Sequence, residues 1–165
     1  MAVRTVPAGD ERDKDVANAI YYAVDNGASI INMSFGKGCS PDKKVVDDAV
    51  KYAARHDVLL VHAAGNDGNE VNSSNNFPTD KYLKRGLFGS KYAPNWIEVG
   101  ALNWEGGENL AADFSNYSAE NVDVFAPGTA IYSTTPDNTY DSYPGTSMAA
   151  PMVAGVAAVL RAYFP

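Results

Sequence analysis

The sequence predicts an α/β fold with a mainly parallel β-sheet, and two observations support this prediction. Strand-like and helix-like segments alternate along the chain at the spacing typical of strand–helix–strand units. In addition, residues 58–64 are almost continuously apolar, which is typical of a strand buried on both faces of a parallel sheet. The chain has 165 residues, so we expect one domain over residues 1–165.

The N-terminal third predicts a helix between two strands. Val3–Val6 is a candidate for a short first strand, and residues 10–15 form a charged run that we interpret as a solvated helix start rather than a metal site. Apolar residues then recur at helical spacing, and Asn26-Gly27 stops the helix. These apolar residues are Val16, Ile20, Ala23 and Val24. A compact strand follows over Ser29–Met33.

The middle of the chain predicts a second helix, the buried strand and a long loop. Ser40-Pro41 opens the helix, with the proline in the first position, where its missing N–H costs nothing. Its expected buried stripe consists of Val45, Val46, Ala49, Val50 and Ala53. Residues 65–95 are polar and rich in Asn, Gly and Ser, and a loop of this length in a compact domain is usually functional or locally ordered.

The last third predicts two further strands, a hairpin and a final helix. The strands cover Trp96–Leu102 and Val122–Ala126, and the hairpin covers Ile131–Tyr143 around a turn at residues 135–138. The helix is expected from about Thr146 to Tyr163. Its apolar run, Met148–Leu160, is interrupted by a proline and is shorter than the ~20 residues of a membrane span. We therefore expect a buried helix and no membrane span.

Composition excludes several classes of protein. The chain carries 13 basic and 20 acidic residues, a net charge of −7, whereas nucleic-acid binding favours a basic surface. A hydrophobic content of 45% and a charged content of 20% argue against a disordered chain. Cys39 is the only cysteine, so neither an internal disulfide nor a cysteine zinc site can form, and we interpret it as an incidental thiol.

The segment 144–155 contains the strongest candidate for chemistry. Ser147 stands at the start of an apolar helix, behind Gly145, which permits a tight turn. Helix N-termini expose backbone N–H groups, so a serine there could attack a carbonyl whose developing oxyanion accepts a hydrogen bond from the backbone. Helix capping by Thr146 or Ser147 is the simpler alternative. Ala149 stands where the Gly-x-Ser-x-Gly motif of the α/β hydrolases requires glycine, so that motif is absent.

Two further segments end at the carboxyl edge of the predicted sheet. Asn66 follows the buried strand, and its amide could donate to an oxyanion, although Asn66-Asp67-Gly68 also suits an ordinary turn. Ser34-Phe35-Gly36 follows the strand before it and could pair with an extended peptide, or could simply be a strand end. Taken separately, each segment favours the simpler interpretation.

Together, the three segments resemble the subtilisin-like serine proteases, the subtilases. The resemblance extends from about Val3 to the C-terminus, with the motifs in the family's order. It rests on Gly145-Thr146-Ser147-Met148-Ala149-Ala150-Pro151, Ala64-Gly65-Asn66 and Ile31-Asn32-Met33-Ser34-Phe35-Gly36, with further matches at Phe114-Ser115-Asn116-Tyr117 and Val124-Phe125-Ala126-Pro127-Gly128. It implies a three-layer subtilisin-like fold with a mainly parallel sheet.

The resemblance also implies roles for individual residues. Ser147 would be the nucleophile that forms an acyl-enzyme, and the Asn66 side chain and the Ser147 N–H would form the oxyanion hole. Ser34, Phe35 and Gly36 would bind the substrate backbone. One wall of the pocket for the side chain before the scissile bond would consist of Ala63, Ala64 and Gly65. The substrate would be a peptide or protein.

Cofactor and location are also matters of family resemblance. No cofactor is expected to be required, and no metal-binding residue is assigned. Calcium could stabilise the loop that carries Asp67, Asn69, Asn72 and Asp80, although polar loops are usually only solvated. The resemblance implies a secreted or periplasmic parent protein, which the chain itself does not indicate.

The family's catalytic triad of Asp, His and Ser is incomplete in this chain. The only histidines are His56 and His62; neither stands in the family's His-Gly-Thr context, and we expect structural roles for both. No Asp-Thr-Gly or Asp-Ser-Gly segment is present. We therefore expect the chain to be the C-terminal portion of a peptidase domain, incomplete on its N-terminal side and inactive alone. Its unpaired strand edges could then produce homo-oligomers.

Two other functions stay open at this point. A pseudoprotease or peptide-binding module would keep the Ser34-Phe35-Gly36 edge but has no need of both Ser147 and Asn66. An esterase or lipase of another fold is disfavoured by Ala149 and by the Asn66 segment.

Overall fold

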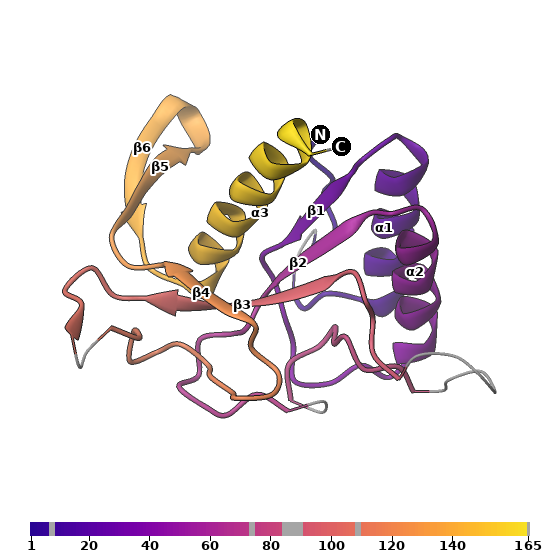
Figure 1. Ribbon diagram of the computed structural model, residues 1–165, viewed down its shortest axis with the longest axis horizontal. Helices are drawn as coiled ribbons and strands as arrows, with labels where there is room; N and C mark the ends of the chain where they lie inside the picture. The colour runs from indigo at the N-terminus through magenta and orange to yellow at the C-terminus, as the bar shows by residue number, and fades with distance from the viewer. Residues whose placement is uncertain (7–8, 73–74, 84–90, 108–109, 165) are drawn as a thin grey trace.

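A parallel four-stranded sheet forms the centre of the molecule in the computed structural model, which describes residues 1–6, 9–72, 75–83, 91–107 and 110–164 (Figure 1). The strands are β1 (Ile30–Met33), β2 (Leu59–Ala63), β3 (Trp96–Leu102) and β4 (Val124–Pro127), in the order β1-β2-β3-β4. All three pairings are parallel, with Ile30 beside Leu59, Leu60 beside Trp96 and Val99 beside Val124. The predicted α/β class is therefore confirmed.

Three α-helices and a hairpin complete the described fold (Figure 1). Helices α1 (Asp13–Asp25) and α2 (Lys43–Arg55) lie together, and α3 (Thr146–Tyr163) lies apart from them. Strands β5 (Ile131–Thr135) and β6 (Thr139–Tyr143) pair antiparallel around a 3₁₀ turn, η2 (Pro136–Asn138). The hairpin and the final helix were both predicted.

Alternating side chains of β2 divide the interior into two cores, so that the domain has three layers. Leu60 is fully buried in a core with the apolar faces of α1 and α2. Its neighbour Val61 and, two residues further, Ala63 point to the other face, where Ala149 and Ala150 of α3 pack. The sheet thus lies between the α1–α2 pair and α3 (Figure 1).

The predicted strand at Val3–Val6 is wrong. This segment has no regular secondary structure and pairs with no strand, so β1 is an edge of the sheet as far as the described residues form it. A hollow of about 690 Å³ lies beside β1, lined by residues of the N-terminal segment, of α1 and of the whole of β1. Val3–Val6 therefore forms no strand pairing with β1.

The start of α2 also differs from the prediction. The helix begins at Lys43, two residues after Pro41, because the preceding turn is bound to Asp13 of α1. The Asp13 carboxylate accepts hydrogen bonds from the Ser40 hydroxyl (2.8 Å) and the Asp42 N–H (2.7 Å), and it pairs with Lys37 (2.8 Å). Burial alone would raise the pKa of Asp13, but these hydrogen bonds outweigh it and the pKa is lowered. The run 10–15 is thus not simply a solvated helix start.

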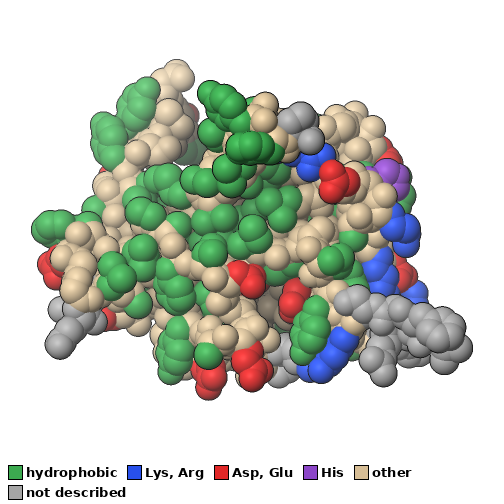
Figure 2. All heavy atoms as spheres, in the orientation of Figure 1, with side chains coloured by type: hydrophobic (Ala, Val, Ile, Leu, Met, Phe, Trp, Pro, Cys, Tyr) green, Lys and Arg blue, Asp and Glu red, His purple; other side chains and the backbone are tan. Residues whose placement is uncertain are grey.

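Helix α3 is not buried in this chain, contrary to the prediction. Ala149 and Ala150 are fully buried, but Met152, Val156, Val159 and Leu160 are exposed to between 43% and 62%. Figure 2 shows hydrophobic side chains gathered on the surface in the region of α3. A smaller error concerns Val45, which is 39% exposed on α2, whereas the other four residues of the predicted stripe are buried.

The length and apolar composition of α3 also bear on the prediction that the chain has no membrane span. By length and composition, Thr146–Tyr163 meets the criteria for a membrane-crossing helix, with a mean hydropathy of 1.2 and 17% of it buried. One such helix is weak support for a span, since core helices of soluble proteins have the same features. The expectation of no membrane span therefore stays a prediction.

Candidate active site

Ser147 is placed at the edge of the sheet by the turn that precedes α3. Gly145 adopts φ 150°, which favours glycine, and its N–H donates to the carbonyl of Gly128 (2.8 Å). Gly128 lies so close to β3 that a Cβ there would stand 2.5 Å from the Cβ of Ala101. Two glycines thus allow the start of α3 to approach the carboxyl ends of β3 and β4.

Ser147 and Ser34 hold each other through two hydrogen bonds. The Ser147 hydroxyl donates to the carbonyl of Ser34 (3.2 Å), and the Ser34 hydroxyl donates to the carbonyl of Ser147 (2.8 Å). The Asn32 side chain donates in turn to the Ser34 hydroxyl (2.9 Å). Segments 113 residues apart in sequence therefore meet at the predicted nucleophile.

The alternative that Thr146 or Ser147 caps α3 is not supported, since the helix has no side-chain cap. Instead, Asn66 Oδ1 accepts hydrogen bonds from the N–H of Thr146 (2.8 Å) and from its hydroxyl (3.0 Å). The Thr146 hydroxyl accepts from the N–H of Gly65 (3.1 Å). Because both donors of Thr146 engage the amide oxygen, the Nδ2 donor of Asn66 is directed elsewhere.

That orientation suits an oxyanion hole. Asn66 Nδ2 lies 3.7 Å from the point where a Cβ on Gly145 would stand, which places it beside the turn before Ser147. The N–H of Ser147 also lacks an intrahelical acceptor, because Ser147 is the second residue of α3. The Ser147 nitrogen lies 3.6 Å from the same point, so the two N–H donors lie beside the same turn.

Asn116 fixes the loop that carries Asn66. Its Oδ1 accepts from the N–H groups of Asp67 and Asn69 (3.0 Å each), and its Nδ2 donates to the carbonyl of Ala64 (2.8 Å). Its own N–H donates to the carbonyl of Gly65 (2.9 Å). Asn116 is 3% exposed, so this anchor is part of the core.

A pocket of about 380 Å³ gathers most of the predicted site. Those predicted residues that line it are Phe35, Gly36, Ala63, Gly65, Asn66 and Ser147. Ser34 and Ala64 do not line it: Ser34 bonds to Ser147, and Ala64 is fully buried behind the wall with its carbonyl bound to Asn116. Further lining residues that the prediction omitted are Lys37, Gly38, Asp67, Asn75, Asn76 and Thr146.

Neither histidine lines this pocket. His62 is fully buried in β2, its Nδ1 lies 3.0 Å from each carboxylate oxygen of Glu98, and its Nε2 has no hydrogen-bond partner among the described residues. His56 is the C-cap of α2, and its Nδ1 lies 2.9 Å from the carbonyl of Tyr52. Their contacts are thus structural ones, and among the described residues no histidine lines the pocket that contains Ser147.

The predicted calcium loop does not form one cluster. Asp67 lies in the pocket beside Ser147, whereas Asn72 and Asp80 line a separate small hollow next to Glu98. Burial raises the pKa of Asp80, and the negative charges of Glu98 and Asp123 raise it further. Within the described ranges, no group of three or more His, Cys, Asp or Glu side chains could hold a metal ion.

Sequence reasoning missed three residues that organise the site: Thr146, Asn116 and Asn76. Thr146 and Asn116 belong to segments that the family resemblance included, but nothing local to them indicates their partners. Asn76 lies within the polar stretch 65–95, which predicted a functional loop without indicating a particular residue.

The fold and this arrangement of serine, asparagine and strand edge agree with the resemblance to the subtilisin-like serine proteases. The model of the subtilase family of peptidases matches residues 1–165. The chain belongs to the subtilase family.

Several known proteins are similar to the chain. It is 40% identical to subtilisin J of Geobacillus stearothermophilus over 152 residues, which are 91% of this chain and 35% of the relative. It is 40% identical to thermitase of Thermoactinomyces vulgaris over 161 residues, covering 97% and 50% of the two chains. The chain thus spans half or less of these relatives.

Solved structures show the same relation. The prenylagaramide maturation protease PagA superposes with a TM-score of 0.74 at 31% identity, covering 94% of this chain and 51% of that one. A cold-adapted subtilisin-like serine proteinase gives a TM-score of 0.73 at 31% identity, covering 93% and 50%. The subtilisin-like fold is therefore shown, over about half of each solved chain.

Proposed function

We propose that this chain carries the nucleophile and the oxyanion hole of a serine endopeptidase, with Ser147 and Asn66 as the catalytic residues. The observation that carries the proposal is that the Asn66 Nδ2 donor and the Ser147 N–H lie beside the same turn at Gly145, and that Asn66 and Ser147 line one pocket next to a strand end. Family membership supports peptidase chemistry.

The reaction follows from the groups at the site. The Ser147 oxygen attacks the peptide carbonyl carbon as a base removes its proton, and the Asn66 Nδ2 and Ser147 N–H groups stabilise the oxyanion. The C–N bond then breaks, and the leaving amine takes the proton from the base. Water hydrolyses the resulting ester on Ser147 by the same steps in reverse.

The base would come from polypeptide outside this chain, as would the Asp that orients it. Three observations support this proposal: neither histidine lines the pocket, no described strand pairs with the outer edge of β1 beside a 690 Å³ hollow, and the chain spans half or less of its relatives. The Ser147 hydroxyl meanwhile donates to the carbonyl of Ser34, which is no base. We expect the chain alone to be nearly inactive.

The substrate would be a peptide or protein that pairs with Ser34, Phe35 and Gly36, its side chain entering between this segment and the wall at Ala63–Gly65. Backbone pairing already occurs directly after this segment, because Lys37 forms an antiparallel bridge with Phe77. The reaction needs no organic cofactor, and calcium would serve stability only. We propose secretion or a periplasmic location for the parent protein, since the relatives are subtilisins.

A pseudoprotease that only binds peptides is the second candidate. It is favoured by one observation, the engagement of the Ser147 hydroxyl with a backbone carbonyl instead of a base. Chemical rescue separates the two candidates, because only a catalytic arrangement uses a base supplied from solution.

The test measures acylation of Ser147 by a peptide p-nitrophenyl ester, detected as an adduct by intact mass. Without added base, we expect the chain to react no faster than a Ser147→Ala control, and a fluorophosphonate probe should behave likewise. Added imidazole should accelerate the reaction, and Asn66→Leu should slow the rescued reaction by about 10²-fold, the size typical for loss of one oxyanion donor.

Each result decides between alternatives. No acceleration by imidazole, or equal rates with Asn66→Leu, would favour the pseudoprotease. Rapid labelling of Ser147 without imidazole would mean that the chain has its own base, His62 being the first candidate.

Self-association is a separate proposal about the free edge of β1. A second copy could pair with this edge, because exposed strand edges are templates for pairing. Sedimentation velocity at low micromolar concentration should then show dimers, and a monomer over this range would contradict the proposal.

A further inference from the structure

Asn76 lies at the base of the pocket beside Ser147, between its two walls. The side chain is 6% exposed and lines the pocket together with Gly36 and Gly65. Its Oδ1 lies 2.6 Å from the point where a Cβ on Gly36 would stand and 3.4 Å from the corresponding point on Gly65. The amide oxygen therefore occupies the gap between the segments 34–36 and 63–65.

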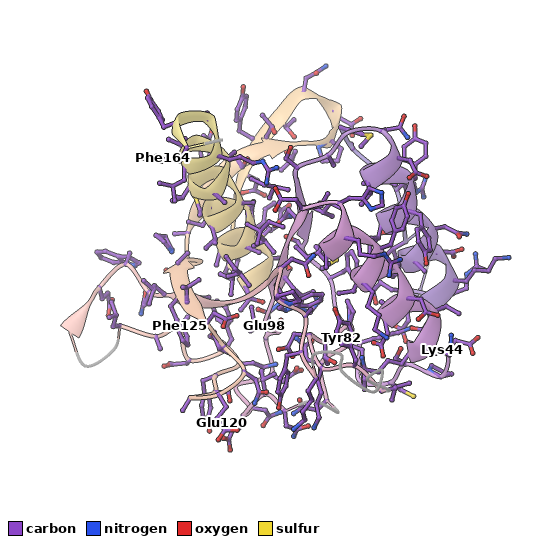
Figure 3. All side chains as sticks on the ribbon, turned by 45° about the vertical axis from the view of Figure 1, so that its right-hand side comes forward. Lys44, Tyr82, Glu98, Glu120, Phe125 and Phe164 are labelled. Carbon is purple, nitrogen blue, oxygen red and sulfur yellow. The ribbon has the colours of Figure 1, made fainter. Side chains whose placement is uncertain are left out.

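The orientation of this amide is fixed by its surroundings. Asn76 Nδ2 donates to the carbonyl of Ala63 (3.1 Å), which can only accept, and to the carboxylate of Glu98 (3.0 Å). Glu98, a buried residue of β3 that is labelled in Figure 3, also accepts from the indole N–H of Trp96 (2.8 Å). Since Nδ2 faces the core, Oδ1 is the atom that faces the pocket.

The charged side chains around the pocket also make it electronegative. Asp67 is exposed and lines the pocket, so its carboxylate adds negative charge. Lys37 also lines the pocket, but its ammonium pairs with Asp13 (2.8 Å) and donates to the carbonyl of Glu11, so its charge is neutralised away from the opening. No other charged side chain lines the pocket among the described residues.

We propose that this pocket selects a basic side chain, lysine or arginine, at the substrate residue before the scissile bond, and that Asn76 is a specificity-determining residue. The proposal rests on the proposed function. An ammonium or guanidinium group donates to Asn76 Oδ1 and is attracted by Asp67. An aliphatic side chain of the same length would leave the buried oxygen without a donor, and a carboxylate would be repelled by both groups.

The volume of the pocket agrees with this substrate class. About 380 Å³ accommodates a long side chain. The Asn76 oxygen then meets the end of the side chain, where lysine and arginine carry their donors.

Binding of product-like peptides tests the proposal without requiring turnover. Acetylated tetrapeptides ending in lysine, norleucine or glutamate are titrated into the ¹⁵N-labelled chain, and the amide signal of Gly65 is followed by NMR. Lysine and norleucine differ chiefly in the ammonium group. We expect the lysine peptide to bind at least tenfold more tightly than norleucine, with glutamate weakest.

Substitutions show which residues cause the preference for lysine. Asn76→Leu should bring the lysine-to-norleucine ratio close to one, whereas Asn18→Leu, on the exposed face of α1, should leave it unchanged. Asp67→Asn is the second variant, because Asp67 is exposed and its loss should not impair folding. It should reduce lysine binding several-fold and leave norleucine binding unchanged.

The outcomes separate this proposal from the one on which it rests. Peptides that bind with equal affinity for lysine and norleucine, or a lysine preference unaffected by Asp67→Asn and Asn76→Leu, would overturn the role of the pocket alone. If no peptide shifted the Gly65 signal, the substrate-binding edge itself would be refuted along with it.

Discussion

The two faces of the sheet are covered very differently. On one face, α1 and α2 bury a continuous core and turn polar residues outward, such as Lys44 and Asp48, which pair at 2.5 Å on α2. On the other face, α3 buries Ala149 and Ala150 against the sheet but leaves Val156 and Leu160 more than half exposed. Phe164, just beyond its end, is 78% exposed (Figure 3).

The difference teaches how to interpret the composition of a helix. An amphipathic helix such as α2 needs cover on one side only, whereas a helix that is apolar all round is normally enclosed. Helix α3 has the composition of an enclosed helix without the enclosure. The same contrast appears along β1, whose inner edge is paired and whose outer edge faces a hollow. Both features agree with the proposal that further polypeptide completes the site.

The largest expected effect compares matched valines on the two sides. Val50 of α2 is 1% exposed, and Val156 of α3 is 62% exposed. Val50→Ala should lower the free energy of unfolding by about 2 kcal/mol, since a buried valine contributes about 1.5–3 kcal/mol. Val156→Ala should change it by less than about 0.5 kcal/mol, as for other surface positions. Urea denaturation of both variants measures the difference.

Because both substitutions replace valine by alanine within a helix, the change in helix propensity is the same and the comparison isolates packing. A loss of more than about 1 kcal/mol in Val156→Ala would contradict the open face. It would indicate that something, such as a second copy, covers α3 in solution, and repeating the measurement at a tenfold lower protein concentration would identify that case.

Sequence patterns predicted the face of the sheet that α1 and α2 cover better than the face that α3 covers. We call these the closed side and the open side. The periodicity of Val16, Ile20 and Ala23 predicted α1 because local spacing alone determines which face is apolar. Helix α3 was placed correctly at Thr146–Tyr163, but its burial depends on what surrounds it, which no local pattern encodes. Val3–Val6 has the composition of a strand and no strand to pair with, so it remains irregular.

The candidate site was predictable where it consists of short motifs. Ser147 and Asn66 were identified because the motifs around them together resemble those of the subtilases, and the structure brings the two residues into one pocket; their roles stay predictions. Asn76 and Asn116 were missed because their importance arises from contacts with segments 13 to 52 residues away, such as the bonds to Ala63 and Ala64. Asp13 was misjudged for the same reason, since its partners lie beyond α1.

A smaller effect is expected at Asp80, on the closed side. Burial and the charges of Glu98 and Asp123 raise the pKa of its carboxyl in the folded chain above its usual value of 3.8. The folded state therefore holds this proton more tightly than the unfolded state, so the contribution of Asp80 to stability is greatest below pH 3.8 and is lost as pH rises through the pKa in the folded chain. Asp80→Asn should remove that loss.

The gain should be less than about 1 kcal/mol, because the side chain keeps partial access to water. Thermal unfolding at several pH values would show the two proteins diverging as pH rises from 3 to 7, with the variant the more stable at pH 7. If the unfolding temperatures of the two proteins changed in parallel with pH, a cationic group or an ion would be neutralising the Asp80 carboxylate in solution.

The smallest effect on stability is expected for the ion pair that links α3 to the turn before β2. Arg161 of α3 pairs with Asp57 in the turn before β2 (2.9 Å) and donates to the carbonyl of the same residue (3.0 Å). The Asp57 side chain is 89% exposed, so the pair is surrounded by water. Arg161→Gln should therefore lower the stability by only a few tenths of a kcal/mol in low salt, and by less at 0.5 M NaCl, where the attraction is screened. If urea denaturation showed a loss above about 1 kcal/mol that salt did not reduce, Arg161 would be holding α3 through packing of its side chain, and the end of α3 would be less open than its exposed neighbours indicate.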